Sequence, residues 1–392
     1  MSFRHQLPVH SPLTLRAVAS GGWALLAGNA HARPRLEALL RHEYGSAATI
    51  LTDSGTSALT LALRAAARAR PGRPVALPAY GCYDLATAVD GAGVGALLYD
   101  LDPATLGPDF ESLRVTLRAG AGAIVVAPLY GIPVDLTEVG RLADRADAVV
   151  IEDTAQAFGM TCLGRPAGAT GAYGVLSFGR GKGVTGGGGG ALLLRTDQER
   201  VDAASETLKP AGGGSPLLGL AAQWALARPW AYGLLSALPL GLGETRYRPT
   251  HPPRGASDVT CAVVLRTLPL AHAEVPVRRT VARRLLGAAR SVERLATVTG
   301  APEGEPSFLR LPLLARGGSA RLLTGKSRAL GIMPGYPAAL CDLAGFGPRV
   351  LNASAEFPGA RALASDLFTL PTHGRLSEGD LLALEAWLAS AR

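Results

Sequence analysis

Short apolar runs recur along the first half of the chain and predict the strands of a β-sheet. They are 74–78, 95–99, 123–128 and 148–153. Stretches with the apolar spacing of a helix, such as 135–145, lie between the later runs. Strands that alternate with helices are typical of a parallel sheet with helices on both faces, so we expect an α/β fold.

The pattern predicts further elements before and after these runs. Helical spacing marks 33–44, and residues 50–63 predict a short strand that runs directly into a helix rich in alanine and leucine. The runs 173–178 and 191–195 predict two more strands. The connection between them reads SFGRGKGVTGGGGGA over 177–191 and is rich in glycine.

After about residue 250 the composition changes, and the pattern predicts a smaller α+β domain. Its expected elements are arginine-rich helices within 277–295, strands at 308–314 and 332–336, and a closing helix over 377–391 with Ser377 and Glu378 at its start. We therefore expect a large domain over 1–245, with a lead-in over 1–47, and a small C-terminal domain over 246–392.

One segment, 216–243, is apolar nearly throughout. Gln223, Arg228, Pro229 and Pro239 interrupt it before it reaches the ~20 apolar residues that a membrane-spanning helix needs. Its few charges do not form the basic face of a helix that lies on a membrane. We expect this segment to pack in a subunit interface rather than on a membrane surface.

The composition narrows the class of protein. Of the 392 residues, 48% are hydrophobic and 18% are charged, which excludes a disordered chain. The net charge is +8, but the arginines are scattered singly and no basic run contains aromatic residues. This distribution disfavours nucleic-acid binding and fits attraction to anionic small molecules.

The four cysteines form no metal-binding pattern, and we expect no metal site. They are typical of buried, reduced thiols. The first residues lack the apolar core and cleavage site of a signal peptide, so we expect a cytoplasmic protein.

Lys182, in the glycine-rich connection, is one of three lysines among 39 basic residues. A lysine amine can lose its proton and form a Schiff base with an aldehyde, whereas arginine cannot. The surrounding glycines allow backbone to pass close to a bulky group, and the phosphate cofactor that pairs with such a lysine is pyridoxal phosphate. Taken alone, the segment fits equally a lysine on a mobile loop.

Two other positions suit the same cofactor. Small hydroxyl residues and a glycine over 54–57 begin a helix, where free backbone N–H groups suit a phosphate, although an ordinary N-cap has the same composition. Asp153 ends the most apolar strand, and parallel sheets bind ligands at such ends. Its carboxylate is either the N-cap of a helix over 154–158 or a ligand of a cationic group, such as the ring nitrogen of the cofactor.

Several segments resemble, in sequence order, the DegT/StrS-type sugar aminotransferases, which are fold-type I pyridoxal phosphate enzymes. These segments are SGTSAL, PAYGCYDLATAV, YDLDPATL, PLYGIPVDL, IEDTAQAFG, SFGRGKGVTGGGGGAL and LPTHGRLSEGDL. The resemblance is close over 54–194 and loose in the C-terminal third. It implies a large cofactor-binding domain with a mostly parallel sheet between helices, and a smaller C-terminal α+β domain.

The resemblance also implies roles for individual residues. Lys182 matches the Schiff-base lysine, which also moves the proton between the donor and the cofactor. Asp153 matches the carboxylate at the ring nitrogen, and Gln156 the residue beside the ring hydroxyl. The positions that match phosphate contacts are Gly55, Thr56, Ser57 and Ser177.

Other positions depart from the family. Where relatives stack an aromatic residue on the cofactor ring, the chain has Cys82, and we expect the neighbouring Tyr83 to take this role. The asparagine that the partner subunit contributes in the family is not evident here, and Arg246 or Arg248 is our candidate for this place. Arg180 is a candidate for an anionic substrate group, or else faces solvent.

The resemblance implies a homodimeric aminotransferase that carries an amino group from an amino acid, glutamate in similar enzymes, to a keto-sugar, usually nucleotide-linked, or to a cyclitol ketone. A pyridoxal phosphate-dependent lyase or dehydratase is the alternative, but known dehydratases of the family have lost the lysine that this chain retains. A non-catalytic scaffold at a membrane is a third interpretation, which the apolar segment 216–243 and the basic net charge suggest.

Overall fold

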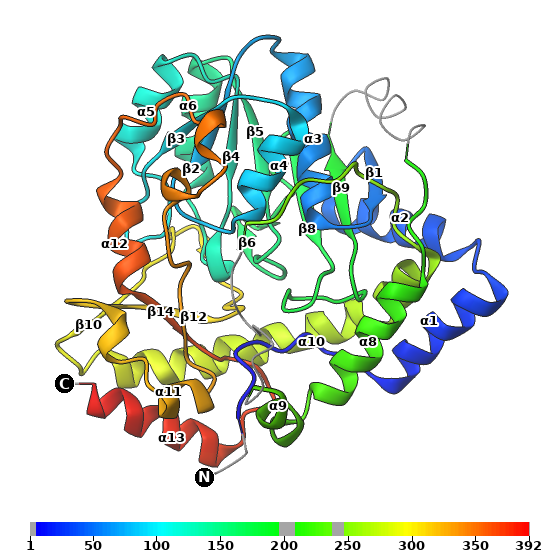
Figure 1. Cartoon of the computed structure of the whole chain (residues 1–392), viewed down its shortest axis with the longest axis vertical. Coiled ribbons are helices and arrows are strands. Elements are labelled where there is room, and N and C mark those ends of the chain that lie inside the picture. The colour runs from blue at the N-terminus through cyan, green and yellow to red at the C-terminus, as the bar shows by residue number, and fades with distance from the viewer. Residues whose placement is uncertain (1–4, 196–207, 237–246, 392) are drawn as a thin grey trace.

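The computed structural model describes residues 5–195, 208–236 and 247–391, and has an α/β fold (Figure 1). Its central sheet has seven strands in the order β1-β9-β8-β5-β4-β2-β3. The strands are β1 (Ala48–Thr52), β2 (Val75–Pro78), β3 (Ala96–Tyr99), β4 (Ala123–Val126), β5 (Val149–Asp153), β8 (Tyr173–Ser177) and β9 (Gly190–Leu194). The paired strands of this sheet are parallel except those of β9, which runs antiparallel to β1 and β8. The expected mostly parallel sheet is confirmed.

Helices cover both faces of this sheet because successive strand residues point to opposite sides. In β2, for example, Leu77 packs in one apolar core with α3 and α4, whereas Ala76 packs in another with α5 and α6. The helices of this part of the chain are α1 (Leu15–Ala27), α2 (Ala32–Tyr44), α3 (Gly55–Ala69), α4 (Asp84–Ala92), α5 (Phe110–Arg118) and α6 (Leu136–Arg145).

The C-terminal part forms a second, antiparallel sheet of four strands in the order β10-β12-β14-β13. Its elements are β10 (Leu295–Thr297), α11 (Gly325–Ala329), β12 (Leu311–Ala315), β13 (Met333–Pro334), α12 (Pro358–Asp366), β14 (Leu367–Leu370) and α13 (Glu378–Ser390). A third, small sheet in the order β11-β6-β7 joins β11 (Gly304–Glu305) to β6 (Thr161–Cys162) and β7 (Arg165–Pro166). The expected boundary at 245 lies outside the described residues, so the division into two domains stays a prediction.

The long helix α10 (Asp258–Ala289) corrects the sequence prediction for 277–295. It begins well before 277, continues through Pro269 and Pro276, and ends before Leu295, which starts β10. A proline inside a helix normally removes a backbone hydrogen bond and favours a break. Here buried residues along most of the helix pack against the rest of the fold, and Figure 1 shows α10 lying along the base of the large sheet. Tertiary packing therefore outweighs the local signal.

Two predicted strands of the C-terminal part are shorter than expected. The strand predicted over 308–314 begins only at Leu311, because the preceding backbone pairs with the connection after β4: Ser307 N–H donates to Gly131 O and Leu309 N–H to Tyr130 O, both at 2.9 Å. The strand predicted over 332–336 is reduced to β13. The closing helix begins at Glu378 after the N-cap Ser377, as expected.

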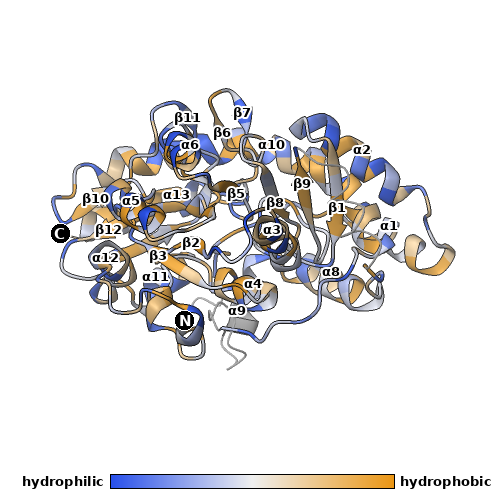
Figure 2. Cartoon of the chain, turned by 90° about the horizontal axis from the view of Figure 1, so that it is seen from above, coloured by the Kyte–Doolittle hydropathy of each residue, from blue (hydrophilic) through white to orange (hydrophobic). Residues whose placement is uncertain are grey.

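The apolar segment 216–243 contains α8 (Gly214–Leu226) and α9 (Pro229–Ser236), and its last residues, 237–243, lie outside the described part. Helix α8 packs beside α1, as Figure 2 also shows. Several large apolar side chains of these helices are exposed: Leu15, Trp23, Leu26, Leu218 and Trp230. Among the described helices, none is long and apolar enough to cross a membrane. The expected subunit interface stays a prediction.

Candidate active site

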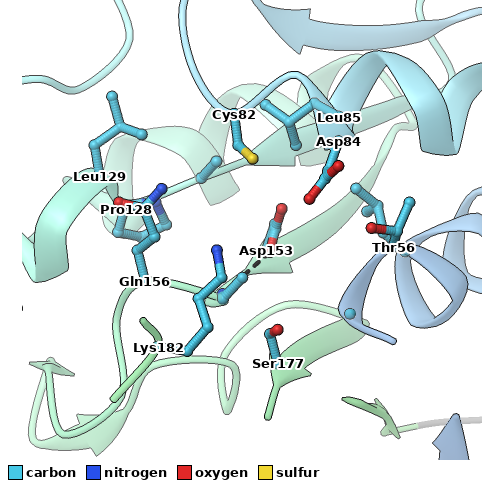
Figure 3. Close-up of a pocket in the computed structure, with 14 residues that line it drawn as sticks. Thr56, Cys82, Asp84, Leu85, Pro128, Leu129, Asp153, Gln156, Ser177 and Lys182 are labelled. Atoms are coloured by element: carbon cyan, nitrogen blue, oxygen red, sulfur yellow. Dashed lines mark hydrogen bonds between the residues drawn. The ribbon is translucent and has the colours of Figure 1, made fainter. Parts of the chain in front are cut away.

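A cavity that is partly open to solvent lies at the carboxyl ends of the parallel strands (Figure 3). Asp153 ends β5, Ser177 ends β8, and the connections after β2 and β4 supply further lining residues. The lining residues are Gly55, Thr56, Leu59, Cys82, Asp84, Leu85, Ala127, Pro128, Leu129, Asp153, Ala155, Gln156, Ser177 and Lys182. This is the edge of the sheet at which the sequence predicted the ligand site.

Lys182 lies in the connection between β8 and β9, with its side chain directed into the cavity (Figure 3). The connection is packed: Val184 and Thr185 are buried, and the Ser11 hydroxyl donates a hydrogen bond to the Lys182 carbonyl oxygen. A Cβ on Gly183 would lie 2.5 Å from Phe158 Cβ, so only glycine fits there. The glycines therefore permit close packing around Lys182, in contrast to the interpretation as a mobile loop.

Asp153 lies across the cavity from Lys182 and is not a helix cap. Residues 154–158 form turns rather than a helix, and one carboxylate oxygen accepts a hydrogen bond from Ala155 N–H at 3.1 Å. Burial raises the pKa of the Asp153 carboxyl, and the Lys182 ammonium opposes this shift. A buried carboxylate of this kind is stabilised by a cationic partner, which the protonated ring nitrogen of pyridoxal phosphate would supply.

The side chain of Gln156 is fixed from two sides. Its Oε1 accepts a hydrogen bond from Tyr130 N–H at 3.2 Å, and its Nε2 donates to the Tyr336 hydroxyl at 2.6 Å. Burial raises the pKa of Tyr336 well above its ordinary value, so the phenol stays protonated. Because Tyr336 follows β13, the C-terminal sheet helps to position a residue of the cavity.

The N-terminus of α3 forms another wall. Ser54 is its N-cap, and the Ser54 hydroxyl accepts a hydrogen bond from Ser57 N–H at 3.0 Å. The next two residues, Gly55 and Thr56, line the cavity. A Cβ on Gly55 would lie 2.8 Å from Ser177 Cβ and 3.0 Å from its Oγ, so the helix end and the hydroxyl of Ser177 meet closely. The two interpretations of this segment are therefore compatible: Ser54 is the N-cap, whereas Gly55 and Thr56 are the candidate phosphate contacts.

Four predicted site residues are not among the residues that line the cavity. Ser57 is buried in α3, and its hydroxyl contacts that of Ser54 at 3.0 Å. The Tyr83 hydroxyl accepts a hydrogen bond from Ala338 N–H at 3.1 Å, while the adjacent Cys82 lines the cavity. Arg180 and Arg248 are both exposed, and Arg246 lies outside the described residues. The cofactor and substrate roles of these four residues stay predictions.

The structure adds residues that sequence reasoning missed. Asp84 and Leu85 begin α4, directly after the β2 connection, and their signal was the position after the carboxyl end of a predicted strand. In Figure 3 the Asp84 carboxylate points toward Asp153, and its charge contributes to the raised pKa of Asp153. Burial raises the pKa of the Cys82 thiol to about 11, so this thiol stays protonated.

The cavity fits pyridoxal phosphate. It brings together an amine, a buried carboxylate, a fixed amide and a helix N-terminus beside a serine, which are the groups that this cofactor requires. In the part of the chain that the structure describes, no group of three or more histidine, cysteine, aspartate or glutamate side chains is placed to hold a metal ion.

The chain is similar in sequence and structure to known aminotransferases. The chain is 34% identical over 181 residues to an L-glutamine:2-deoxy-scyllo-inosose aminotransferase of Streptomyces kanamyceticus, a match that covers 45% of this chain and 42% of the relative. It is 32% identical over 164 residues to a UDP-N-acetyl-3-dehydro-alpha-D-glucosamine 3-aminotransferase of Acidithiobacillus ferrooxidans, covering 42% of this chain and 44% of the relative. The matched part of the chain thus spans less than half the length of these relatives.

The whole fold has a counterpart among solved structures. The putative sugar aminotransferase Spr1654 of Streptococcus pneumoniae, in its PLP form, superposes with a TM-score of 0.76 at 18% identity and covers 99% of this chain and 100% of its own. Residues 11–215 match the model of the DegT/DnrJ/EryC1/StrS aminotransferase family. The expected resemblance is confirmed, and with it pyridoxal phosphate as the cofactor of the family. The chain belongs to the DegT/DnrJ/EryC1/StrS aminotransferase family.

Proposed function

We propose that this protein is a pyridoxal phosphate-dependent aminotransferase that moves an amino group from an amino acid to the ketone of a sugar or cyclitol. The observation that carries the proposal is the meeting of Lys182 and Asp153 in one cavity, with Gln156 and the N-terminus of α3 in its walls. When bound, pyridoxal phosphate supplies a ring that withdraws the electron pair released at the reacting carbon.

Different residues of the cavity would hold different parts of the cofactor. Gly55, Thr56 and Ser177 would hold the phosphate, where the helix N-terminus favours negative charge. The Asp153 carboxylate would keep a proton on the ring nitrogen, and Gln156 would lie beside the ring hydroxyl.

Lys182 has two tasks in the proposed reaction. Its amine would hold the aldehyde of the cofactor and, when free, would take the proton from the α-carbon of the donor. In the second half of the reaction the same amine would return a proton to the reacting carbon of the acceptor. The protonated Cys82 thiol, with its pKa raised to about 11, does not compete with the amine for the aldehyde.

The substrates are proposed from the relatives and from the chemistry of the site. By their names, one relative acts on an inosose and another on a nucleotide-linked keto-sugar. We propose an acceptor of one of these two kinds, glutamate as the donor, and a homodimer as the active assembly. The first relative's name specifies L-glutamine, so glutamine is the donor to compare.

The test is a single-turnover experiment without acceptor. We expect the holoenzyme to form one equivalent of 2-oxo acid per active site from glutamate or glutamine, and to release no more until a keto acceptor is added. Candidate acceptors are scyllo-inosose and nucleotide-linked keto-sugars. Absence of the 2-oxo acid, together with turnover of a hydroxylated sugar to a dehydrated product, would support the lyase alternative instead.

A further inference from the structure

Arg310, which precedes β12, has a guanidinium group that is largely shielded from solvent. Its Nε and Nη2 atoms are buried, and among the described residues they have no hydrogen-bond partner. Burial lowers the pKa of Arg310, and the groups that oppose this shift are the phenols of Tyr130, Tyr336 and Tyr232, none of which carries a negative charge at neutral pH. The described part of the chain therefore gives this buried cation no counter-ion.

The backbone around Arg310 places it beside the candidate active site. The residue before it, Leu309, donates its N–H to the Tyr130 carbonyl oxygen at 2.9 Å. Tyr130 follows Leu129, which lines the cavity, and its N–H holds Gln156, also a lining residue. Tyr336, another neighbour of Arg310, holds the other end of Gln156 at 2.6 Å. Arg310 thus lies next to the residues that hold Leu129 and Gln156 in the wall of the cavity.

An unpaired buried cation is costly to the folded protein, because it has lost its hydration and gained no ion pair. Such a cost is retained at a site where a ligand supplies the missing charge. A guanidinium group offers a planar fork of N–H donors that matches a carboxylate in two parallel hydrogen bonds. The observed group has two of these donors free, Nε and Nη2, which form one edge of the fork.

We propose that Arg310 binds the carboxylate of the amino-acid donor and thereby orients its α-carbon toward Lys182. The inference rests on the proposed aminotransferase function and names a residue for the donor. A phosphate of the acceptor is the other anion to consider. A carboxylate fits better, because every amino-acid donor carries it one bond from the reacting carbon.

Tyr232, in helix α9 of the apolar segment, lies near Arg310. Burial raises the pKa of its phenol, and the charges of Arg310 and Arg180 both oppose this shift, so Tyr232 lies near both arginines. Arg180 is exposed and does not carry the proposal.

The test measures binding of glutarate, which has the carboxylates of glutamate but no amine, to the holoenzyme by calorimetry. The variants are Arg310→Met, Arg310→Lys, and the control Arg316→Met, which removes an exposed arginine just after β12. We expect Arg310→Met to weaken glutarate binding about tenfold or more, since a hydrogen-bonded charge pair is lost. Arg310→Lys keeps the charge without the fork and is expected between wild type and Arg310→Met, whereas the control binds like the wild type.

A second readout separates ligand binding from a structural role. In the absence of glutarate, Arg310→Met is expected to melt no lower than Arg316→Met, because it removes an uncompensated buried charge. Equal glutarate affinity in these two variants would overturn the proposal, and so would failure of Arg310→Met to fold, which would mean that the cation is needed for the structure. If the wild type lacks visible absorption with pyridoxal phosphate, the proposed function fails; if that absorption is normal and glutarate binding does not depend on Arg310, only this inference fails.

Discussion

Gly55 and Ser177 meet closely in the wall of the cavity where we propose that the phosphate binds, and Gly55→Ala perturbs this contact with one methyl group. The new Cβ would lie 2.8 Å from Ser177 Cβ and 3.0 Å from Ser177 Oγ, closer than carbon atoms approach in folded proteins. Overpacking of this kind costs about 1–3 kcal/mol, and the helix preference of alanine over glycine returns up to about 1 kcal/mol. We expect a net loss of about 1–2 kcal/mol in the free energy of unfolding, by these two contributions together.

Urea unfolding of the cofactor-free protein measures this loss. Gly140→Ala in α6 is the matched control, because its Cβ would meet no atom within 4 Å. It is therefore expected to be neutral or stabilising. The double variant Gly55→Ala/Ser177→Gly removes the clashing atoms, and we expect it to recover most of the loss, which is a coupling of about 1 kcal/mol or more. Equal stabilities of Gly55→Ala and Gly140→Ala, or additive effects in the double variant, would refute the reasoning.

The remaining predictions concern charge and hydrogen bonding around the cavity. Burial raises the pKa of Asp153, so the folded state disfavours its charged form. We therefore expect cofactor-free Asp153→Asn to be more stable than the wild type at neutral pH. This difference in stability should vanish as the pH falls through the raised pKa and the Asp153 carboxyl becomes protonated in both the folded and the unfolded protein. A wild type that is the more stable at neutral pH would contradict this. Tyr336→Phe deprives Gln156 Nε2 of its acceptor, and we expect a loss of about 1–3 kcal/mol in urea unfolding and a changed absorption of the bound cofactor; an unchanged spectrum would exclude a positioning role. Burial lowers the pKa of His373 to about 4 and that of His10 to about 3. Below a pH of about 6.5 these histidines bind protons in the unfolded protein before they do so in the folded protein, so the free energy of unfolding should fall as the pH drops. The expected fall is about 3 kcal/mol for His373 alone. His373→Gln should flatten this slope, and parallel slopes in the two proteins would count against the assignment.

Local periodicity correctly predicted the strands of the large sheet, but it predicted the elements of the C-terminal part less accurately. The predicted strands of the large sheet agree with the structure because each is a short, continuous apolar run that is buried on both faces. Helix α10 was predicted too short because its prolines are local break signals, whereas its length is decided by packing along the whole molecule. Residues 308–310 have the composition of a strand, yet Leu309 N–H donates to the carbonyl oxygen of Tyr130, 179 residues earlier in the sequence (309 − 130), a contact that periodicity cannot reveal.

The order of strand ends and family motifs along the chain identified most of the candidate site residues. Lys182, Asp153, Gln156 and Ser177 were each assigned from a strand end or from a family motif, and the structure brings them together in one cavity. Tyr336 and Arg310 were missed because their proximity to the cavity arises from the packing of the C-terminal sheet against the connection after β4. No local pattern distinguishes them from other polar residues near a strand.

The role of Lys182 is the central claim, and visible absorption after addition of pyridoxal phosphate tests it most directly. A lysine amine that bonds the aldehyde of the cofactor gives a band that free lysines in solution do not reproduce at the same protein concentration. The control is Lys326→Ala, which removes an exposed lysine in α11. We predict the band in the wild type and in Lys326→Ala, and its loss in Lys182→Ala with the fold retained. An unchanged band in Lys182→Ala would contradict the account.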